Sequence, residues 1–185
     1  MSRSSRSSLL SFSFALITAA SSAGAPAPEL APGIAAQLPQ ARVQGGGELT
    51  FLGLSIYDAH LYRSLNARGI WSPDEPFALQ LVYHRSLKGP LVAARSIEEM
   101  DKQGACNAEQ RGRWAELLTK ILPDVDAGDS LTGVNVPKRG VQFYQNGKLI
   151  GSIDDIAFSR AFFGIWLNPE TSEPALRQQL LGITR

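Results

Sequence analysis

The residues of this sequence that could do chemistry are a small group of imidazole, carboxylate, phenol and hydroxyl side chains. They are Tyr57, Asp58, His60, Tyr83, His84 and Ser159. The two histidines fall on different predicted strands and could meet in the fold, but no third residue at a metal-ligand spacing accompanies them. The sequence also lacks a Gly-x-Ser-x-Gly nucleophile elbow. The pattern therefore predicts no metal and no cofactor, and it leaves Ser159, Tyr57 and His84 as candidates for a relocated catalytic site.

Length and composition predict one globular domain. The chain has 185 residues, of which 44% are hydrophobic and 19% are charged, and these values exclude a disordered chain and two large domains. The formal charge of +1 includes Arg3 and Arg6, which belong to a segment that we expect to be removed. Without them, 16 basic residues (two fewer than the 18 of the full chain) stand against 17 acidic ones. A net charge of −1 does not indicate a basic surface for binding nucleic acid or a polybasic patch for binding membranes.

Residues 1–25 have the pattern of a secretory signal peptide. A basic end is followed by an apolar run from Leu9 to Ile17, which is too short to span a bilayer, and then by small residues. We therefore expect an exported protein, periplasmic or secreted, with no integral membrane segment after cleavage. Cys106 is the only cysteine, so no intramolecular disulfide can form.

The next segment, residues 26–41, is rich in alanine and proline and predicts a linker, so the folded domain is expected over residues 42–185. Early in the domain, the triglycine 45–47 predicts a bend before a long strand, 47–62. This strand is largely apolar on both faces up to Tyr57, as a central strand would be, and polar on one face after it. Alternation, helical spacing, proline and capping signals predict the other elements. They are a strand at 77–84, helices at 89–103 and 107–122, and strands at 130–136, 141–145 and 148–152. Asp154 or Asp155 is then expected to cap a helix that runs through Trp166, and Thr171 or Ser172 to start a last helix that Gly182 closes.

Two short signals in this series are specific. Asn107 followed by Gln110 is a capping-box pattern at the start of a helix, and Asn146-Gly147 predicts a tight hairpin. The strands cluster before and after a pair of helices instead of alternating with them. This order predicts an α+β domain with a largely antiparallel sheet.

Five stretches of the chain resemble the bacterial chalcone isomerase-like proteins. They are FLGLSIYDAHLY, YHRSLKG before a helix, LLTKILPDVDAGDSLTGV, FYQNGKLIGSI and, most specifically, FFGIWLNPETSEPALRQQLLG. The similarity extends from about Arg42 to Gly182. It implies an open-faced β-sandwich with helices packed on one face of the large sheet, which agrees with the order of predicted elements.

The resemblance also implies positions for the polar residues that plant chalcone isomerases use to cyclise a chalcone. Their threonine falls on Leu52, and their tyrosine and asparagine fall near Val92 and Glu99. A Ser/Thr that contacts the substrate falls on Ser159, and the nearest counterpart of their arginine is Arg42. Because leucine and valine cannot donate hydrogen bonds to a developing enolate, and loss of such donors costs several powers of ten in rate, we do not expect the isomerase reaction.

A binding function is the alternative that the resemblance implies, because the same fold includes proteins that hold a fatty acid in an apolar cleft. The expected ligand is a small apolar or fatty-acyl molecule bound between the sheet and the helices. The residues expected at this cleft are Arg42, Leu52, Leu54, Val92, Glu99, Phe158, Ser159 and Phe162, with Phe163 and Arg160 as further contributors. A competing interpretation is that the aromatic side chains fill the core.

Two other function classes stay open from the sequence alone. One is an enzyme, either an isomerase of the chalcone–flavanone type (an intramolecular lyase) or an enzyme with the relocated site named above. The other is an envelope interaction module in which Trp166, Leu167 and the loop 169–174 expose an apolar patch. Packing of these residues between the last two helices is the competing explanation, because tryptophan is usually buried.

Overall fold

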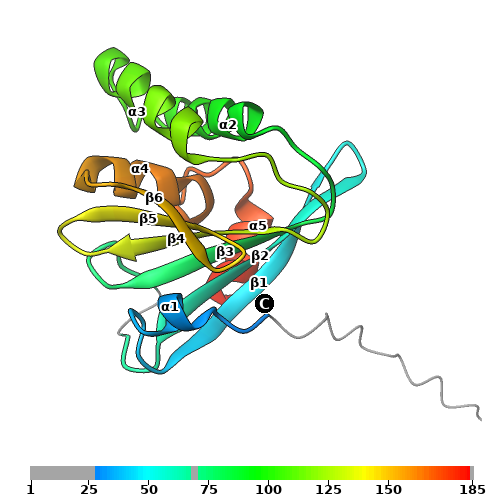
Figure 1. Ribbon diagram of the computed structural model, residues 1–185, viewed down its shortest axis with the longest axis vertical. Coiled ribbons are helices and arrows are strands. Elements are labelled where there is room, and N and C mark those ends of the chain that lie inside the picture. The colour runs from blue at the N-terminus through cyan, green and yellow to red at the C-terminus, as the bar shows by residue number, and fades with distance from the viewer. Residues whose placement is uncertain (1–27, 68–70, 184–185) are drawn as a thin grey trace, which may run out of the picture.

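The computed structural model describes residues 28–67 and 71–183, which contain a six-stranded antiparallel sheet (Figure 1). The strands follow one another in chain order, so each pairs with the next along the sequence. They are β1 (Ala41–Phe51), β2 (Leu54–Ser64), β3 (Phe77–Tyr83), β4 (Ser130–Val136), β5 (Gly140–Gln145) and β6 (Lys148–Ile153). The predicted α+β fold with an antiparallel sheet is confirmed, whereas the predicted signal peptide, 1–25, lies outside the described residues.

Helices lie along one side of this sheet, with one short exception. The helices are α1 (Pro32–Ala35), α2 (Gly89–Lys102), α3 (Ala108–Ile121), α4 (Ile156–Leu167) and α5 (Pro174–Leu181). Figure 1 shows α2, α3 and α4 above the sheet, and α5 packs beside β1 on the same side, while α1 lies against the opposite side. Within the described part of the chain, none of the helices has both the length and the apolar content needed to cross a bilayer.

Local capping fixes where α3 and α4 begin. The Asn107 side chain accepts from the Gln110 backbone N–H, and the Gln110 side chain accepts from the Asn107 backbone N–H, so the predicted capping box is confirmed. Asp155 caps α4 by accepting from the backbone N–H groups of Ala157 and Phe158. Both caps satisfy donors that a helix start would otherwise leave unpaired.

The long strand predicted for residues 47–62 is wrong, because the chain turns back at Leu52-Gly53 and forms the β1–β2 hairpin. Leu52 and Gly53 both have positive φ, 50° and 76°, as a type I′ turn requires. The apolar pattern continues through the turn without a polar break, so the sequence reads as one strand. The turn leaves 86% of Leu52 exposed, together with about half of Phe51 and Leu54.

Two glycines of β1 allow α5 to pack closely against the sheet, instead of forming the predicted bend. A Cβ atom at Gly45 would overlap the carbonyl oxygen of Gln179, and a Cβ atom at Gly47 would overlap the Gln179 side chain. Any larger residue at these positions would therefore push α5 away from β1. The triglycine thus serves helix packing within an unbroken strand.

Residues 28–40, predicted as linker, pack onto the sheet. Leu30, Ile34 and Leu38 are buried there and form a second, smaller core. Their partners on the sheet are Tyr62, Ala78, Val134 and Tyr144. The sheet therefore has a hydrophobic core on each side, with the larger one between the sheet and α2 to α5.

Candidate ligand-binding cavity

A cavity of about 320 Å³ lies within the larger core, between the sheet and helices α2 and α4. This volume is at the lower end of the range typical of small-molecule sites. Most of the lining is apolar and comes from four strands and both helices. Representative residues are Leu49 of β1, Ile56 of β2, Leu79 and Leu81 of β3, Leu131 of β4, Val92 of α2, and Phe162 and Ile165 of α4. Such a lining offers shape and dispersion contacts to an apolar guest.

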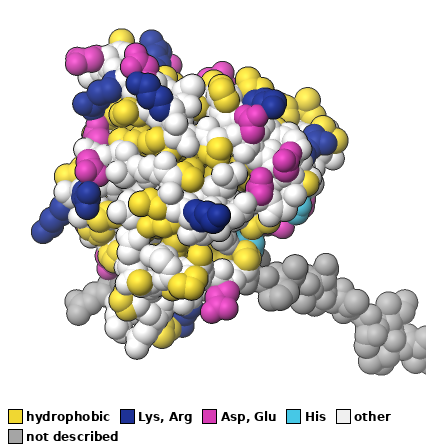
Figure 2. All heavy atoms as spheres, in the orientation of Figure 1, with side chains coloured by type: hydrophobic (Ala, Val, Ile, Leu, Met, Phe, Trp, Pro, Cys, Tyr) yellow, Lys and Arg dark blue, Asp and Glu magenta, His cyan; other side chains and the backbone are white. Residues whose placement is uncertain are grey.

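Part of the rim of the cavity is also apolar. Phe51, in the β1–β2 hairpin, and Leu91, in α2, both line the cavity, and 56% and 66% of their surfaces are exposed. Figure 2 shows hydrophobic side chains over the tip of this hairpin, at the upper right, with charged side chains of both signs next to them. The route between the cavity and solvent therefore passes apolar side chains.

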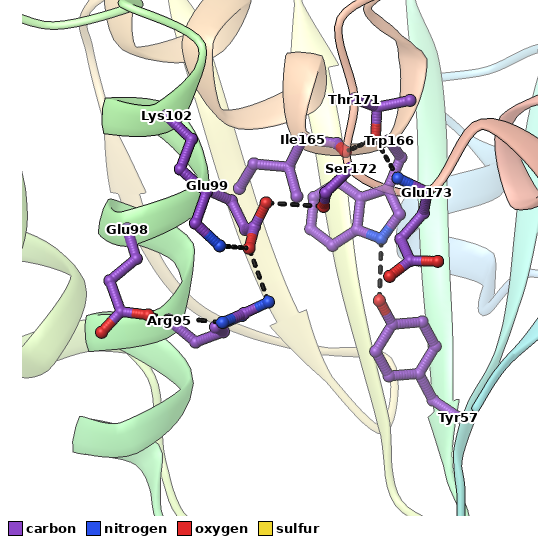
Figure 3. Close-up of polar contacts among 10 residues, drawn as sticks. All are labelled: Tyr57, Arg95, Glu98, Glu99, Lys102, Ile165, Trp166, Thr171, Ser172 and Glu173. Carbon is purple, nitrogen blue, oxygen red and sulfur yellow. Dashed lines mark hydrogen bonds and ion pairs between the residues drawn. The ribbon is translucent and has the colours of Figure 1, made fainter. Parts of the chain in front are cut away.

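Two tyrosines place phenol groups at the cavity. Tyr57 of β2 and Tyr83 of β3 are opposite each other in register, and their rings pack edge to face with centroids 5.7 Å apart. The Tyr57 hydroxyl oxygen accepts a hydrogen bond of 2.9 Å from Trp166 Nε1 of α4 (Figure 3). Burial raises the pKa of both phenols. They are therefore uncharged at neutral pH and can donate hydrogen bonds.

A polar cluster on α2 meets the cavity near Tyr57 (Figure 3). Arg95 and Glu99 both line the cavity, and Arg95 Nη2 lies 2.6 Å from Glu99 Oε1. Glu99 also accepts from Lys102 Nζ at 2.8 Å and from Ser172 Oγ at 2.7 Å. Because only 5% of Glu99 is exposed, these three donors replace the water that its carboxylate would otherwise bind.

The lining of the cavity has more acidic than basic side chains. Burial raises the pKa of Glu99, but the hydrogen bonds from Lys102 and Ser172 and the charge of Arg95 outweigh burial and hold this pKa below its usual range. Glu99 is therefore ionised at neutral pH. Glu173 adds a second carboxylate to the lining, so two acidic residues stand against the single cation that the described lining contains, Arg95.

Three of the eight residues predicted at the cleft line the cavity: Val92, Glu99 and Phe162. Leu52 and Leu54 lie instead at the exposed tip of the β1–β2 hairpin, because the turn at Leu52-Gly53 directs them to solvent. Arg42 lies exposed near the start of β1, next to Arg63 of β2 and outside the lining. Arg42 and Leu52, the two positions of β1 and its turn that the resemblance matched to isomerase residues, therefore do not reach the cavity.

The remaining predicted residues lie in the core or on the surface. Phe158 and Phe163 are fully buried in the large aromatic cluster and lie outside the lining, as the competing core interpretation expects. Ser159 is buried, and its hydroxyl donates to Asn135 Oδ1 at 2.7 Å, away from the cavity. Arg160 is exposed and pairs with an aspartate on the surface.

Of the three catalytic candidates, Tyr57 lines the cavity, and Ser159 and His84 do not. His84 Nε2 lies 3.1 Å from Asp58 Oδ2 at the surface, and with Glu48 these residues form a cluster whose ligand atoms lie within 4.8 Å of one another. The cluster is open to solvent, where such groups commonly occur without an ion. His60 lies elsewhere on β2, so the two histidines do not meet.

Sequence reasoning missed several polar residues of the lining. The resemblance placed Glu99 at the cleft, but no sequence pattern marked Arg95 as its neighbour there. Ser172 and Glu173 were interpreted only as the start of the last helix. A usable signal exists in α2, because Val92 and Glu99 are seven residues apart and so share one helix face.

Of the region proposed as an exposed interaction patch, the apolar residues Trp166 and Leu167 are buried, whereas most of the loop 169–174 is exposed and polar or proline. Trp166 and Leu167 are both in the large core, with Trp166 between the sheet and the polar cluster of α2 (Figure 3). Thr171, in the following loop, donates its hydroxyl to the Ile165 carbonyl oxygen at 2.5 Å. The two apolar residues therefore pack in the core, as the competing explanation expected, and the exposed part of the loop offers no large apolar side chain.

The fold and the cavity define an open-faced β-sandwich that holds a small-molecule-sized space between its sheet and its helices. The sequence model of the family described as chalcone isomerase-like matches residues 49–182. The chain belongs to this chalcone isomerase-like family, as its resemblance implied.

Two proteins illustrate what this chain is similar to. A Haemophilus influenzae protein, described as "Uncharacterized protein", is 28% identical over 142 residues, which cover 76% of this chain and 68% of the relative. The crystal structure of an Arabidopsis thaliana fatty-acid binding protein matches with a TM-score of 0.61 and 12% identity, over 77% of this chain and 87% of the other. At that level of identity the second match shows a shared fold.

Proposed function

We propose that this protein is exported and that it binds a small apolar or acyl ligand in the cavity, without catalysing a reaction. The observation that carries the proposal is an apolar cavity of about 320 Å³ inside an otherwise packed core. A space of this kind costs packing energy, and a ligand that fills it restores the missing contacts. The shared fold with a fatty-acid binding protein supports the same class of ligand.

The residues at the cavity support binding over catalysis. Val92, at the position where the resemblance places a catalytic tyrosine, cannot donate a hydrogen bond. Glu99 is a weak proton acceptor because its pKa is lowered. Tyr57 and Tyr83 can donate hydrogen bonds, but burial disfavours their phenolate forms. These groups orient a ligand more readily than they move its protons.

The binding proposal is tested by filling the cavity. Val92→Phe adds a ring to the lining, whereas Ala94→Phe adds the same ring to an exposed position of the same helix. The probe is N-phenyl-1-naphthylamine, an uncharged apolar fluorophore, titrated into the exported protein. We expect Val92→Phe to weaken binding about tenfold or more, since the added ring occupies the ligand's space, and Ala94→Phe to leave it unchanged. No binding by the native protein, or equal binding by all three proteins, would contradict the proposal.

The export proposal has its own measurement. The mass of the protein recovered from the periplasm or the medium shows which N-terminal residues have been removed. We expect loss of a segment that ends near residue 25, because the basic end, apolar run and small residues form a signal-peptidase substrate. A recovered chain with Met1 intact would contradict this part of the proposal.

A further inference from the structure

We infer that the cavity selects a ligand whose polar end is an uncharged carbonyl group, such as an acyl ester or amide, over the carboxylate of a free fatty acid. The inference rests on the proposed binding function and specifies its ligand. Tyr57 and Tyr83 supply the hydrogen-bond donors for the carbonyl oxygen, while Glu99 and Glu173 disfavour an anion. Three features of the lining lead to this conclusion.

The first feature is a pair of unused phenol protons. Tyr83 is only 2% exposed, and its hydroxyl has no hydrogen-bond partner among residues 28–67 and 71–183. The Tyr57 oxygen accepts from Trp166 Nε1, and within the same described residues its proton has no acceptor. Because both side chains line the cavity, an acceptor carried by the ligand can take these protons, whereas an apolar group placed there would leave them unpaired. Donation by the indole also polarises the Tyr57 hydroxyl and strengthens it as a donor.

The second feature is that Arg95, the cation of the described lining, is already neutralised. Arg95 Nη2 lies 2.6 Å from Glu99 Oε1, and Arg95 Nη1 lies 3.4 Å from Glu98 Oε2 on the outer side. Glu99 is held in place by Lys102 and Ser172 as well. A ligand carboxylate would therefore meet a guanidinium whose charge Glu99 and Glu98 already balance, and would add a further negative charge beside these carboxylates.

The third feature is the balance of charge around the Tyr57 hydroxyl. Besides burial, the negative charges of Glu173 and Glu99 raise the pKa of Tyr57, more than the positive charge of Arg95 lowers it. The same charges that disfavour a phenolate there disfavour a carboxylate bound to the Tyr57 hydroxyl. An ester or amide oxygen accepts the same hydrogen bonds without bringing a negative charge.

The experiment compares two ligands with the same chain, methyl dodecanoate and dodecanoate, at pH 8. Each displaces N-phenyl-1-naphthylamine from the native protein, so both affinities are measured against one uncharged probe. We expect the ester to bind at least about tenfold more tightly, because the acid must bring its charge beside Glu99 and Glu173. Dodecanoate that binds as tightly as the ester, or more tightly, overturns the inference while leaving the proposed function in place. If neither ligand nor the probe binds, the proposed function fails and the inference falls with it.

Two variants then test the donors. We expect Tyr57→Phe and Tyr83→Phe each to weaken binding of the ester about 2- to 10-fold, which corresponds to the loss of one hydrogen bond between uncharged groups. Binding of the probe should change little. Tyr83→Phe removes a hydroxyl that bonds to no described residue, so the fold should tolerate it even if Tyr57→Phe is destabilised. If both variants bind the probe and the affinity for the ester is unchanged in both, the phenols do not donate hydrogen bonds to the ligand and the inference is overturned.

A charge variant tests the selection against anions. Glu99→Gln keeps the shape of the side chain and its contact with Ser172 but frees Arg95 from its buried partner. We expect this variant to bind dodecanoate about tenfold more tightly than the native protein does. The matched control is Glu98→Gln, which changes an exposed residue of the same helix that also pairs with Arg95 but lies outside the lining. An equal effect of the two variants, or no gain in dodecanoate binding for Glu99→Gln, overturns the inference.

Discussion

At the scale of single residues, Asp155 joins the start of α4 to α3. Its carboxylate accepts from two backbone N–H groups of α4 and, at 3.0 Å, from Nε1 of the fully buried Trp114, and it pairs with Arg113. We expect Asp155→Ala to lower the free energy of unfolding by about 2–3 kcal/mol, because it removes a helix cap and leaves a buried indole N–H unpaired. Urea unfolding at pH 7 measures the change. Asp154→Ala is the control, since Asp154 is half exposed and pairs only with Arg139 among the described residues; equal losses would contradict the prediction.

The same carboxylate gives this prediction a pH dependence. Burial raises the pKa of Asp155, but the hydrogen bonds from Phe158, Trp114 and Ala157 and the charge of Arg113 lower it more, so the folded pKa lies below the unfolded value of 3.8. A depressed folded pKa contributes stability above the unfolded pKa and loses it as the pH falls through the folded pKa. The stability difference between the native protein and Asp155→Ala should therefore be constant above about pH 5 and shrink below about pH 4. If the stability difference between the two proteins stays the same at lower pH, the ionised carboxylate of Asp155 is not the form that stabilises the fold.

At the scale of elements, two hairpins with the same turn geometry differ in how they can be predicted. Asn146-Gly147 has φ values of 49° and 78°, and Leu52-Gly53 has 50° and 76°. Asparagine adopts positive φ at low cost, so the first turn is visible in the sequence, whereas leucine does not. The second turn was therefore hidden inside an apolar alternation. The correct prediction of β5 and β6 and the failure at β1 and β2 have this one local cause.

The hidden turn leads to a stability prediction. Leu52→Asn should raise the free energy of unfolding by about 1 kcal/mol, because it relieves the left-handed strain of a leucine whose side chain is almost fully exposed. Thermal unfolding followed by circular dichroism measures the gain. Leu149→Asn is the matched control, because Leu149 is an exposed leucine in strand β6. It should give no gain, and a similar rise in both variants would mean that removing exposed apolar surface, and not relief of strain, is responsible.

At the scale of the whole molecule, the architecture could be predicted from the sequence and the cavity largely could not. Strand alternation, helix spacing and the cap at Asn107 are local, so the order of the later elements followed from neighbouring residues. The cavity is made by segments between Leu49 and Glu173, and no local pattern marks which side chains leave space between them. Phe158 and Phe162 show the difficulty: they are one helical turn apart and equally apolar, yet the first fills the core and the second lines the cavity.

The segment before β1 decides how much of the chain belongs to one folding unit. Residues 28–40 carry Leu38, which is fully buried against the side of the sheet that faces away from α2 to α5. If this segment is part of the cooperative fold, Leu38→Ala should lower the free energy of unfolding by about 2–4 kcal/mol, since it opens a cavity in the smaller core. The measurement is urea unfolding followed by tryptophan fluorescence, which reports from Trp114 and Trp166 in the larger core and from Trp71 packed against it.

That choice of signal makes the test decisive, because the mutated residue and the tryptophans lie on opposite sides of the sheet. A single transition that moves to lower urea in Leu38→Ala means that both cores unfold together through the sheet they share. Leu65→Ala, a change of the same size at a half-exposed residue after β2, should leave the transition near its native position. A linker detached from the fold would give an unshifted tryptophan transition for Leu38→Ala as well, and that result would restrict the cooperative unit to the domain from residue 42 onward.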